Sequence, residues 1–135
     1  MRVAHYPRLF DPAGEGPVLR GTQCSLCGRV YFPPIGIGCE VCGAGVDHLT
    51  PKLLSTNGIV FALAQVNLTP TPFTVLEIVL DDGPLIRAMM HPQSAAVAIG
   101  DRVTARWTVV DHDAEGAEIV EPGFVKSTTS VRVGA

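Results

Sequence analysis

Apolar and polar residues alternate along much of the second half of the chain, and a period of two is the pattern of half-buried β-strands. The clearest case is the segment 73–80, in which Leu76, Ile78 and Leu80 fall on one face and Glu77 falls on the other. This spacing predicts a strand that packs its aliphatic face into a core and leaves the opposite face toward solvent.

Turn residues separate this strand from four others, which we expect over residues 58–68, 84–90, 102–110 and 117–126. The run Asp81-Asp82-Gly83 predicts a hairpin turn after the second strand, because Asp-Gly tolerates a positive φ. Residues 92–99 are predicted to form one short helix that ends at Gly100. Five strands with a helix between the third and the fourth is the element order of an OB-fold barrel.

Three details within these strands are also predicted. Segment 102–110 is expected to point four residues inward, namely Val103, Ala105, Trp107 and Val109. Gly58, near the start of the first strand, indicates a bulge, and Pro122 and Gly123 are expected to interrupt the last strand.

The first 20 residues contain Pro7, Pro12, Gly14, Gly16 and Pro17, which allow at most a turn or two of helix. We therefore divide the chain into four parts. They are an N-terminal arm (1–20), a metal ribbon (21–50), an OB-fold (51–126) and a C-terminal tail (127–135).

The four cysteines form two CxxC pairs, Cys24 with Cys27 and Cys39 with Cys42, and a glycine follows each pair. Such a pair can close a tight turn, or knuckle, and the glycine provides the positive φ that the turn requires. Two knuckles make a closed tetrahedral four-thiolate site, which suits structural Zn²⁺. Iron, two disulfides or a redox-active CxxC are the alternatives, although a cytosolic chain disfavours disulfides and thioredoxin-type chemistry needs a βαβ unit. A ribbon of about 28 residues needs the metal to fold.

Composition limits the classes of function. The 135 residues carry a formal net charge of −3, which argues against binding to a phosphate backbone. Charged residues make up 17% of the chain, against about 25% in an average soluble domain, and the mean hydropathy is +0.30. The chain is therefore more apolar than an average domain. This excess predicts a protein partner. No apolar run reaches membrane-spanning length and no secretory signal is evident, so we expect a cytoplasmic protein with no membrane contact.

The sequence offers no catalytic constellation of its own. With all four cysteines assigned to metal, no thiol remains as a nucleophile. His5, His48, His91 and His112 fall in separate segments without the spacing of ligands or bases. The paired aspartates lie in predicted turns, where Asp is expected for backbone reasons. We therefore expect a non-catalytic chain.

Six motifs occur in an order that points to a known family: QCSLCGR (23–29), YFPP (31–34), CEVCG (39–43), GIVF (58–61), LDDGP (80–84) and IGDRV (99–103). Over residues 20–126 the chain resembles the acyl-CoA-associated proteins catalogued as domain of unknown function thirty-five, in which a rubredoxin-like zinc ribbon precedes an OB-fold. The resemblance implies an accessory subunit of a thiolase-like enzyme, such as a thiolase, acyltransferase or aldolase. Such an enzyme makes or breaks carbon–carbon bonds in acyl-CoA thioesters. Members usually begin with an amphipathic helix, and the prolines and glycines of the arm forbid a long one here.

Seven residues are candidates for contact with a partner or with acyl-CoA at its interface: Arg29, Tyr31, Phe32, Met89, Met90, Val131 and Val133. Each has a simpler interpretation. Arg29 can be a solvated charge, Tyr31 and Phe32 can pack the ribbon against the barrel, and alternation places one of the two methionines in the core. The valines belong to a tail that can add a strand to another subunit or stay disordered.

Two other classes of function remain open at this point. Zinc ribbons and OB-folds are both common in single-stranded nucleic-acid-binding proteins, but those use aromatic residues among basic ones. Aromatic residues make up only 6% of this chain. An iron-loaded ribbon would instead be a rubredoxin-like electron carrier.

Overall fold

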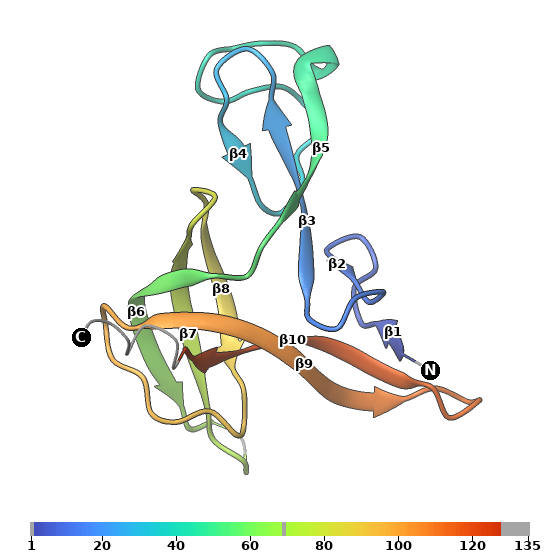
Figure 1. Cartoon of the computed structure of the whole chain (residues 1–135), viewed down its shortest axis with the longest axis vertical. Coiled ribbons are helices and arrows are strands. Elements are labelled where there is room, and N and C mark those ends of the chain that lie inside the picture. The colour runs from blue at the N-terminus through green and yellow to red at the C-terminus, as the bar shows by residue number, and fades with distance from the viewer. Residues whose placement is uncertain (1, 69, 128–135) are drawn as a thin grey trace.

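The computed structural model describes residues 2–68 and 70–127, and it is almost entirely β. Figure 1 shows an elongated molecule with a ribbon at one end and a barrel at the other. The barrel consists of five strands: β6 (Gly58–Val66), β7 (Phe73–Leu80), β8 (Leu85–Met90), β9 (Arg102–His112) and β10 (Glu118–Lys126). The predicted number and order of strands are confirmed.

The barrel closes with the topology of an OB-fold. Strands β6, β7 and β8 form an antiparallel meander, β8 pairs in parallel with β10, and β10 pairs with β9. Strand β9 returns to β6 through Gly58 and Ile59, which completes the circle. Gly83, with φ of 119°, forms the predicted hairpin turn between β7 and β8.

The predicted helix at residues 92–99 is wrong: within the described chain, the one helical turn is a 3-10 turn at Val46–His48 (η1) in the ribbon. Side chains bond to backbone groups that a helix would use: the carboxylate of Asp101 accepts the N–H of Ala98, and the hydroxyl of Ser94 donates to the carbonyl oxygen of Ala95. The Ser94 hydroxyl also accepts the N–H of Lys126 in β10. Such contacts compete with helix formation and tie this connection to β10.

Two predictions about strand irregularities are also wrong in position. The bulge in β6 lies between Val60 and Ala62, at Phe61, and not at Gly58. Gly58 instead permits close packing, since an added Cβ would lie 2.6 Å from the carbonyl oxygen of Val79. Strand β10 continues through Pro122 and Gly123, and its irregularity falls between Ile119 and Val120.

The barrel core follows the alternation. Leu76, Ile78 and Leu80 are at most 1% exposed, and Val103 and Ala105 point inward as predicted. Trp107 is half-buried, and Val109 is exposed, contrary to prediction. The exposure of these two side chains has one cause. The β9–β10 hairpin extends beyond the barrel (Figure 1), so the end of β9 has no core to face.

The ribbon is built on β3 (Val18–Cys24), β4 (Val30–Tyr31) and β5 (Leu49–Leu54). Residues 49–54, expected to be a link, pair antiparallel with β3 from Leu19↔Leu54 to Cys24↔Leu49. Leu19 and Leu54 are buried in the same cluster as Val60, Leu76 and Phe124 of the barrel. Ribbon and barrel therefore share one hydrophobic core.

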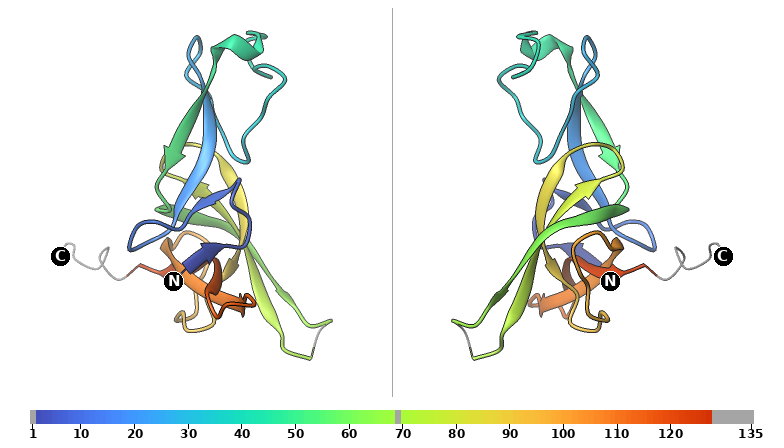
Figure 2. Two further views of the ribbon diagram at one scale, coloured as in Figure 1. Left: turned by 90° about the vertical axis from the view of Figure 1, so that its right-hand side faces the viewer. Right: turned by 90° about the vertical axis from the view of Figure 1, so that its left-hand side faces the viewer.

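The arm folds back along the molecule without a long helix. Strand β1 (Arg2–Ala4) pairs in parallel with β10, and β2 (Phe10–Asp11) pairs with β3. Figure 2 shows these strands beside the barrel, with the β6–β7 hairpin reaching away from it. The arm thus adds to both sheets.

Candidate metal centre

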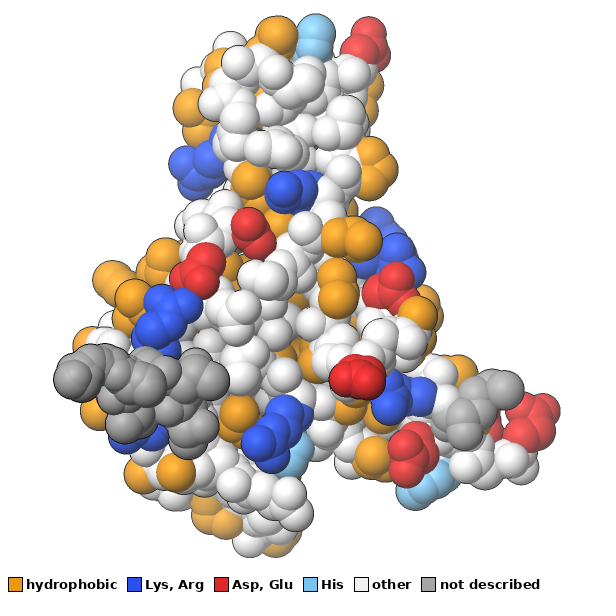
Figure 3. Space-filling view, in the orientation of Figure 1, with side chains coloured by type: hydrophobic (Ala, Val, Ile, Leu, Met, Phe, Trp, Pro, Cys, Tyr) orange, Lys and Arg blue, Asp and Glu red, His pale blue; other side chains and the backbone are white. Residues whose placement is uncertain are grey.

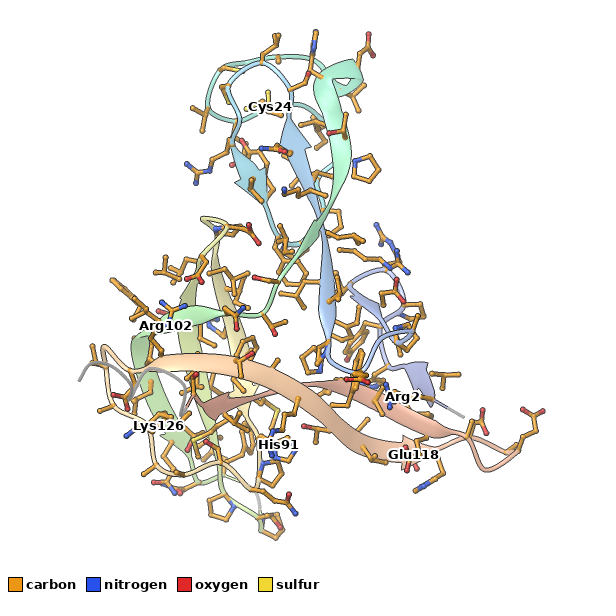
Figure 4. All side chains as sticks on the ribbon, in the orientation of Figure 1. Arg2, Cys24, His91, Arg102, Glu118 and Lys126 are labelled. Atoms are coloured by element: carbon orange, nitrogen blue, oxygen red, sulfur yellow. The ribbon has the colours of Figure 1, made fainter. Side chains whose placement is uncertain are left out.

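The four cysteine sulfurs converge at the far end of the ribbon, where Figure 4 labels Cys24. All four Sγ atoms lie within 4.8 Å of one another. Cys24 and Cys39 are buried, whereas Cys27 and Cys42 reach the surface. This arrangement brings four sulfurs close enough together to bind one metal ion.

Two equivalent knuckles build the site. The N–H of Gly28 donates to the carbonyl oxygen of Cys24 at 2.9 Å, and the N–H of Gly43 donates to that of Cys39 at 3.0 Å. The glycines have φ values of 82° and 79°, which are accessible to glycine at little cost. The glycine that follows each CxxC pair is therefore what allows each turn to close.

The sulfurs are electrostatically unequal. The N–H groups of Cys27 and Leu26 lower the pKa of Cys24. The Ala44 N–H also favours a thiolate at Cys42, but burial and the three neighbouring sulfurs outweigh it and raise the pKa of Cys42 to about 12. Four thiolates at this spacing repel one another, so all of them ionise together only around a cation. Four soft thiolates with no open position fit Zn²⁺ in a structural role.

Tyr31 belongs to this centre. It is 9% exposed, and its hydroxyl lies 3.2 Å from the Sγ of Cys39 and accepts the N–H of Glu40 at 3.0 Å. The Tyr31 hydroxyl, with the N–H groups of Cys42 and Val41, lowers the pKa of Cys39 to about 6. The neighbouring sulfur and burial raise the pKa of Tyr31, so its hydroxyl keeps its proton.

The other candidate contact residues lie apart from the metal. The guanidinium of Arg29 lies 5.7 Å from the ring centre of Tyr31, on the ribbon. Phe32 and Met90 pack against the barrel core, while Met89 is 39% exposed. Val131 and Val133 lie outside the described residues.

The sequence did not reveal an apolar groove of about 250 Å³ between the arm, the ribbon and the barrel. Its walls include Tyr6 and Phe10 from the arm, Phe32 from the ribbon, and Ile86 and Met89 from β8. The one indication of this groove in the sequence was the presence of large apolar residues, such as Tyr6 and Phe10, in an arm otherwise rich in proline and glycine. These residues cover the barrel and need no helix to do so.

The histidines stay apart. His5 pairs with Glu121 at 3.0 Å on the arm, and His48 meets the hydroxyl of Ser25 at 3.3 Å on the exposed ribbon tip. His91 accepts the N–H of Gln93 in a turn. In the described part of the chain, these histidines form no common cluster.

The outer face of β6, β7 and β8 carries exposed aliphatic residues in register. Ile59 pairs with Val79, and Val79 pairs with Leu85. These three residues are 39–50% exposed, and Phe61 in the β6 bulge is 59% exposed. Figure 3 shows hydrophobic side chains gathered on this side of the barrel. We call Ile59, Val79 and Leu85 the outer aliphatic ladder.

Comparison with known proteins is consistent with both parts of the fold. Residues 13–47 match the family model described as ChsH2, rubredoxin-like zinc ribbon domain. Among solved structures, the chain is similar to one chain of the "Ltp2-ChsH2(DUF35) aldolase", with a TM-score of 0.62 and 20% identity. The alignment covers 80% of this chain and 84% of the other, so the two share ribbon and barrel. No helix in residues 2–68 or 70–127 is long and apolar enough to span a bilayer.

Proposed function

We propose that the chain belongs to the DUF35 family, with a ChsH2-type zinc ribbon followed by an OB-fold barrel, and that it is an accessory subunit of a thiolase-fold enzyme. The partner would make or break a carbon–carbon bond in an acyl-CoA thioester. The single observation that carries the proposal is the shared two-part fold with a chain of an aldolase assembly.

The surface supports a role in assembly. A chain with 17% charged residues exposes an aliphatic ladder over three neighbouring strands, and contiguous apolar surface of this kind is typical of an interface. We assign the outer aliphatic ladder to contact with the thiolase-fold partner. Phe32 and Met89, which border the apolar groove, are further candidates for contact with the partner or with the acyl group that it holds.

The side chains available on this chain suggest which roles belong to it and which to the partner. Cys24, Cys27, Cys39 and Cys42 would hold Zn²⁺, which supplies a cross-link between the knuckles and leaves no position open for substrate. The catalytic nucleophile and base would come from the partner. This chain would stabilise that partner and shape its binding surface.

Native co-purification tests the proposal. A tagged full-length chain, purified from its source cells, should retain a thiolase-fold protein in fixed stoichiometry, identified by mass spectrometry. The purified complex should convert acyl-CoA thioesters, and the isolated chain should not. Recovery of nucleic acid, or of no stoichiometric partner, contradicts the proposal.

A matched pair of variants tests the assigned surface. Val79→Asp places a charge at the centre of the outer aliphatic ladder and should abolish co-purification. Gln65→Asp places the same charge at an exposed polar position of β6 and should leave co-purification intact. Retention of the partner by Val79→Asp would exclude the ladder as the contact surface.

A further inference from the structure

The two knuckles of the metal centre are equivalent in their backbone, but their first sulfurs have different surroundings. In each knuckle, the backbone N–H groups two and three residues after the first cysteine favour its thiolate: those of Leu26 and Cys27 lower the pKa of Cys24, and those of Val41 and Cys42 lower the pKa of Cys39. Cys39 alone, among the described cysteines, also lies within hydrogen-bond distance of a side-chain hydroxyl, that of Tyr31. A symmetric pair of turns therefore has one added, asymmetric contact.

The other hydrogen bond of the Tyr31 hydroxyl determines which atom is the donor in its contact with Cys39. A phenol has one proton to donate and lone pairs to accept with. The backbone N–H of Glu40 donates to the Tyr31 oxygen at 3.0 Å, so the Tyr31 proton is free to point at the Cys39 sulfur 3.2 Å away. A metal-bound thiolate can only accept. The two contacts are thus compatible with each other and with a bound cation.

The surroundings of Tyr31 hold the ring in this position. Tyr31 is packed with Cys24 and Cys39 in the small core of the ribbon, and Arg29 lies over its ring. Its backbone pairs with Thr22 of β3, and the next residue, Phe32, packs against the barrel core. Tyr31 and its neighbour Phe32 therefore link the second knuckle, the sheet of the ribbon and the wall of the groove.

We propose that Tyr31 is a positioning residue of the metal centre, which orients the Cys39 thiolate by donating its hydroxyl proton to the sulfur and fixes the second knuckle by accepting the Glu40 N–H. Groups that hydrogen-bond to metal ligands orient those ligands and tune their affinity for the metal. This role is independent of the proposed function, because it concerns the ribbon and not its partner.

The test is Tyr31→Phe, which keeps the ring and removes the hydroxyl. The matched control is Tyr6→Phe, the same change at the only other tyrosine, which lies half-exposed on the arm. We expect the zinc dissociation constant of Tyr31→Phe, measured by competition with a chromophoric chelator, to rise about tenfold. With Co²⁺ in place of zinc, its sulfur-to-metal charge-transfer bands should shift, since one sulfur loses a hydrogen bond. Tyr6→Phe should match the wild type in both measurements.

Zinc affinity within twofold of the wild type, together with an unchanged Co²⁺ spectrum, would overturn the proposal. Fluorescence of Trp107 in β9 reports whether the barrel of each variant is folded. If Tyr31→Phe does not fold, nuclear magnetic resonance of the cadmium-loaded wild-type chain decides the question. A slowly exchanging Tyr31 hydroxyl proton that is correlated with ¹¹³Cd supports the role, and its absence contradicts it.

Discussion

Gly21 lies where β3 runs too close to β4 for any side chain. A Cβ added at this position would overlap the carbonyl oxygen of Tyr31 and would lie 3.1 Å from the Cδ1 atom of Leu54. The carbonyl belongs to the backbone of a paired strand, so it can move only with the ribbon sheet. Gly36, in the same ribbon, has no atom within 4 Å of an added Cβ.

We predict that Gly21→Ala lowers the free energy of unfolding by about 1–3 kcal/mol, the usual cost of overpacking. Gly36→Ala should be neutral or slightly stabilising, because it restricts the unfolded chain without creating a clash. Thermal unfolding of the zinc-loaded proteins measures both. Equal stability of the two variants would mean that the β3–β4 contact tolerates a side chain.

At the scale of single residues, the sequence predicts contacts between residues that are close along the chain and misses contacts between residues that are far apart along it. The two CxxC pairs are visible because each knuckle is made within five residues. The hydroxyl of Tyr31 reaches Cys39 only after β4 has paired with β3. No spacing rule connects a tyrosine to a sulfur eight residues away, so the sequence left Tyr31 as one candidate among several.

Strand β7 shows how one element separates core from surface. Ile78 is fully buried between neighbouring strands, whereas Val79, the next residue, belongs to the outer aliphatic ladder and is 39% exposed. The two side chains are of similar size and chemistry. Their different burial therefore gives a direct test of the assigned faces.

Ile78→Ala should lower the free energy of unfolding by about 2–5 kcal/mol, because it leaves a cavity in the shared core. Val79→Ala should cost less than about 1 kcal/mol in the isolated chain, since it removes surface that is already partly in water. Urea unfolding followed by Trp107 fluorescence compares them. A similar loss for both variants would contradict the assignment of faces.

Strands were predictable at the scale of elements, because a period of two appears in the sequence itself. The helix at residues 92–99 failed for a reason that lies outside the segment. The bond from the Lys126 N–H to the Ser94 hydroxyl depends on β10, which follows about 30 residues later. Likewise, the pairing of residues 49–54 with β3 depends on the metal ribbon between them and not on their own pattern.

At the scale of the whole molecule, the metal and the barrel are joined through one core. Leu19 and Leu54 are almost completely buried among barrel residues, yet they lie on β3 and β5, the two strands by which the chain enters and leaves the metal ribbon. Disorder in the ribbon would therefore loosen the ends of β3 and β5 inside the barrel. Ribbon and barrel should unfold together.

Removal of zinc tests this coupling. A strong chelator should lower the unfolding midpoint reported by Trp107, the single tryptophan, which lies on the barrel strand β9. Cys39→Ala should reproduce the effect without chelator and should also abolish co-purification of the partner. A Trp107 transition that is unchanged after complete loss of zinc would show that the two parts are independent.

The length of the paired strands β3 and β5 sets the distance between the barrel core and the metal centre. Six residue pairs, from Leu19↔Leu54 to Cys24↔Leu49, span the distance from the barrel core to the metal. Each residue of a strand advances the chain by about 3.3 Å, and side chains return to the same face after two. Two residues added to both strands would therefore carry the metal about 7 Å further out with every face preserved, and a single added residue would turn the faces over. The reach of the ribbon is thus set in whole steps of two residues, whatever the lengths of its loops.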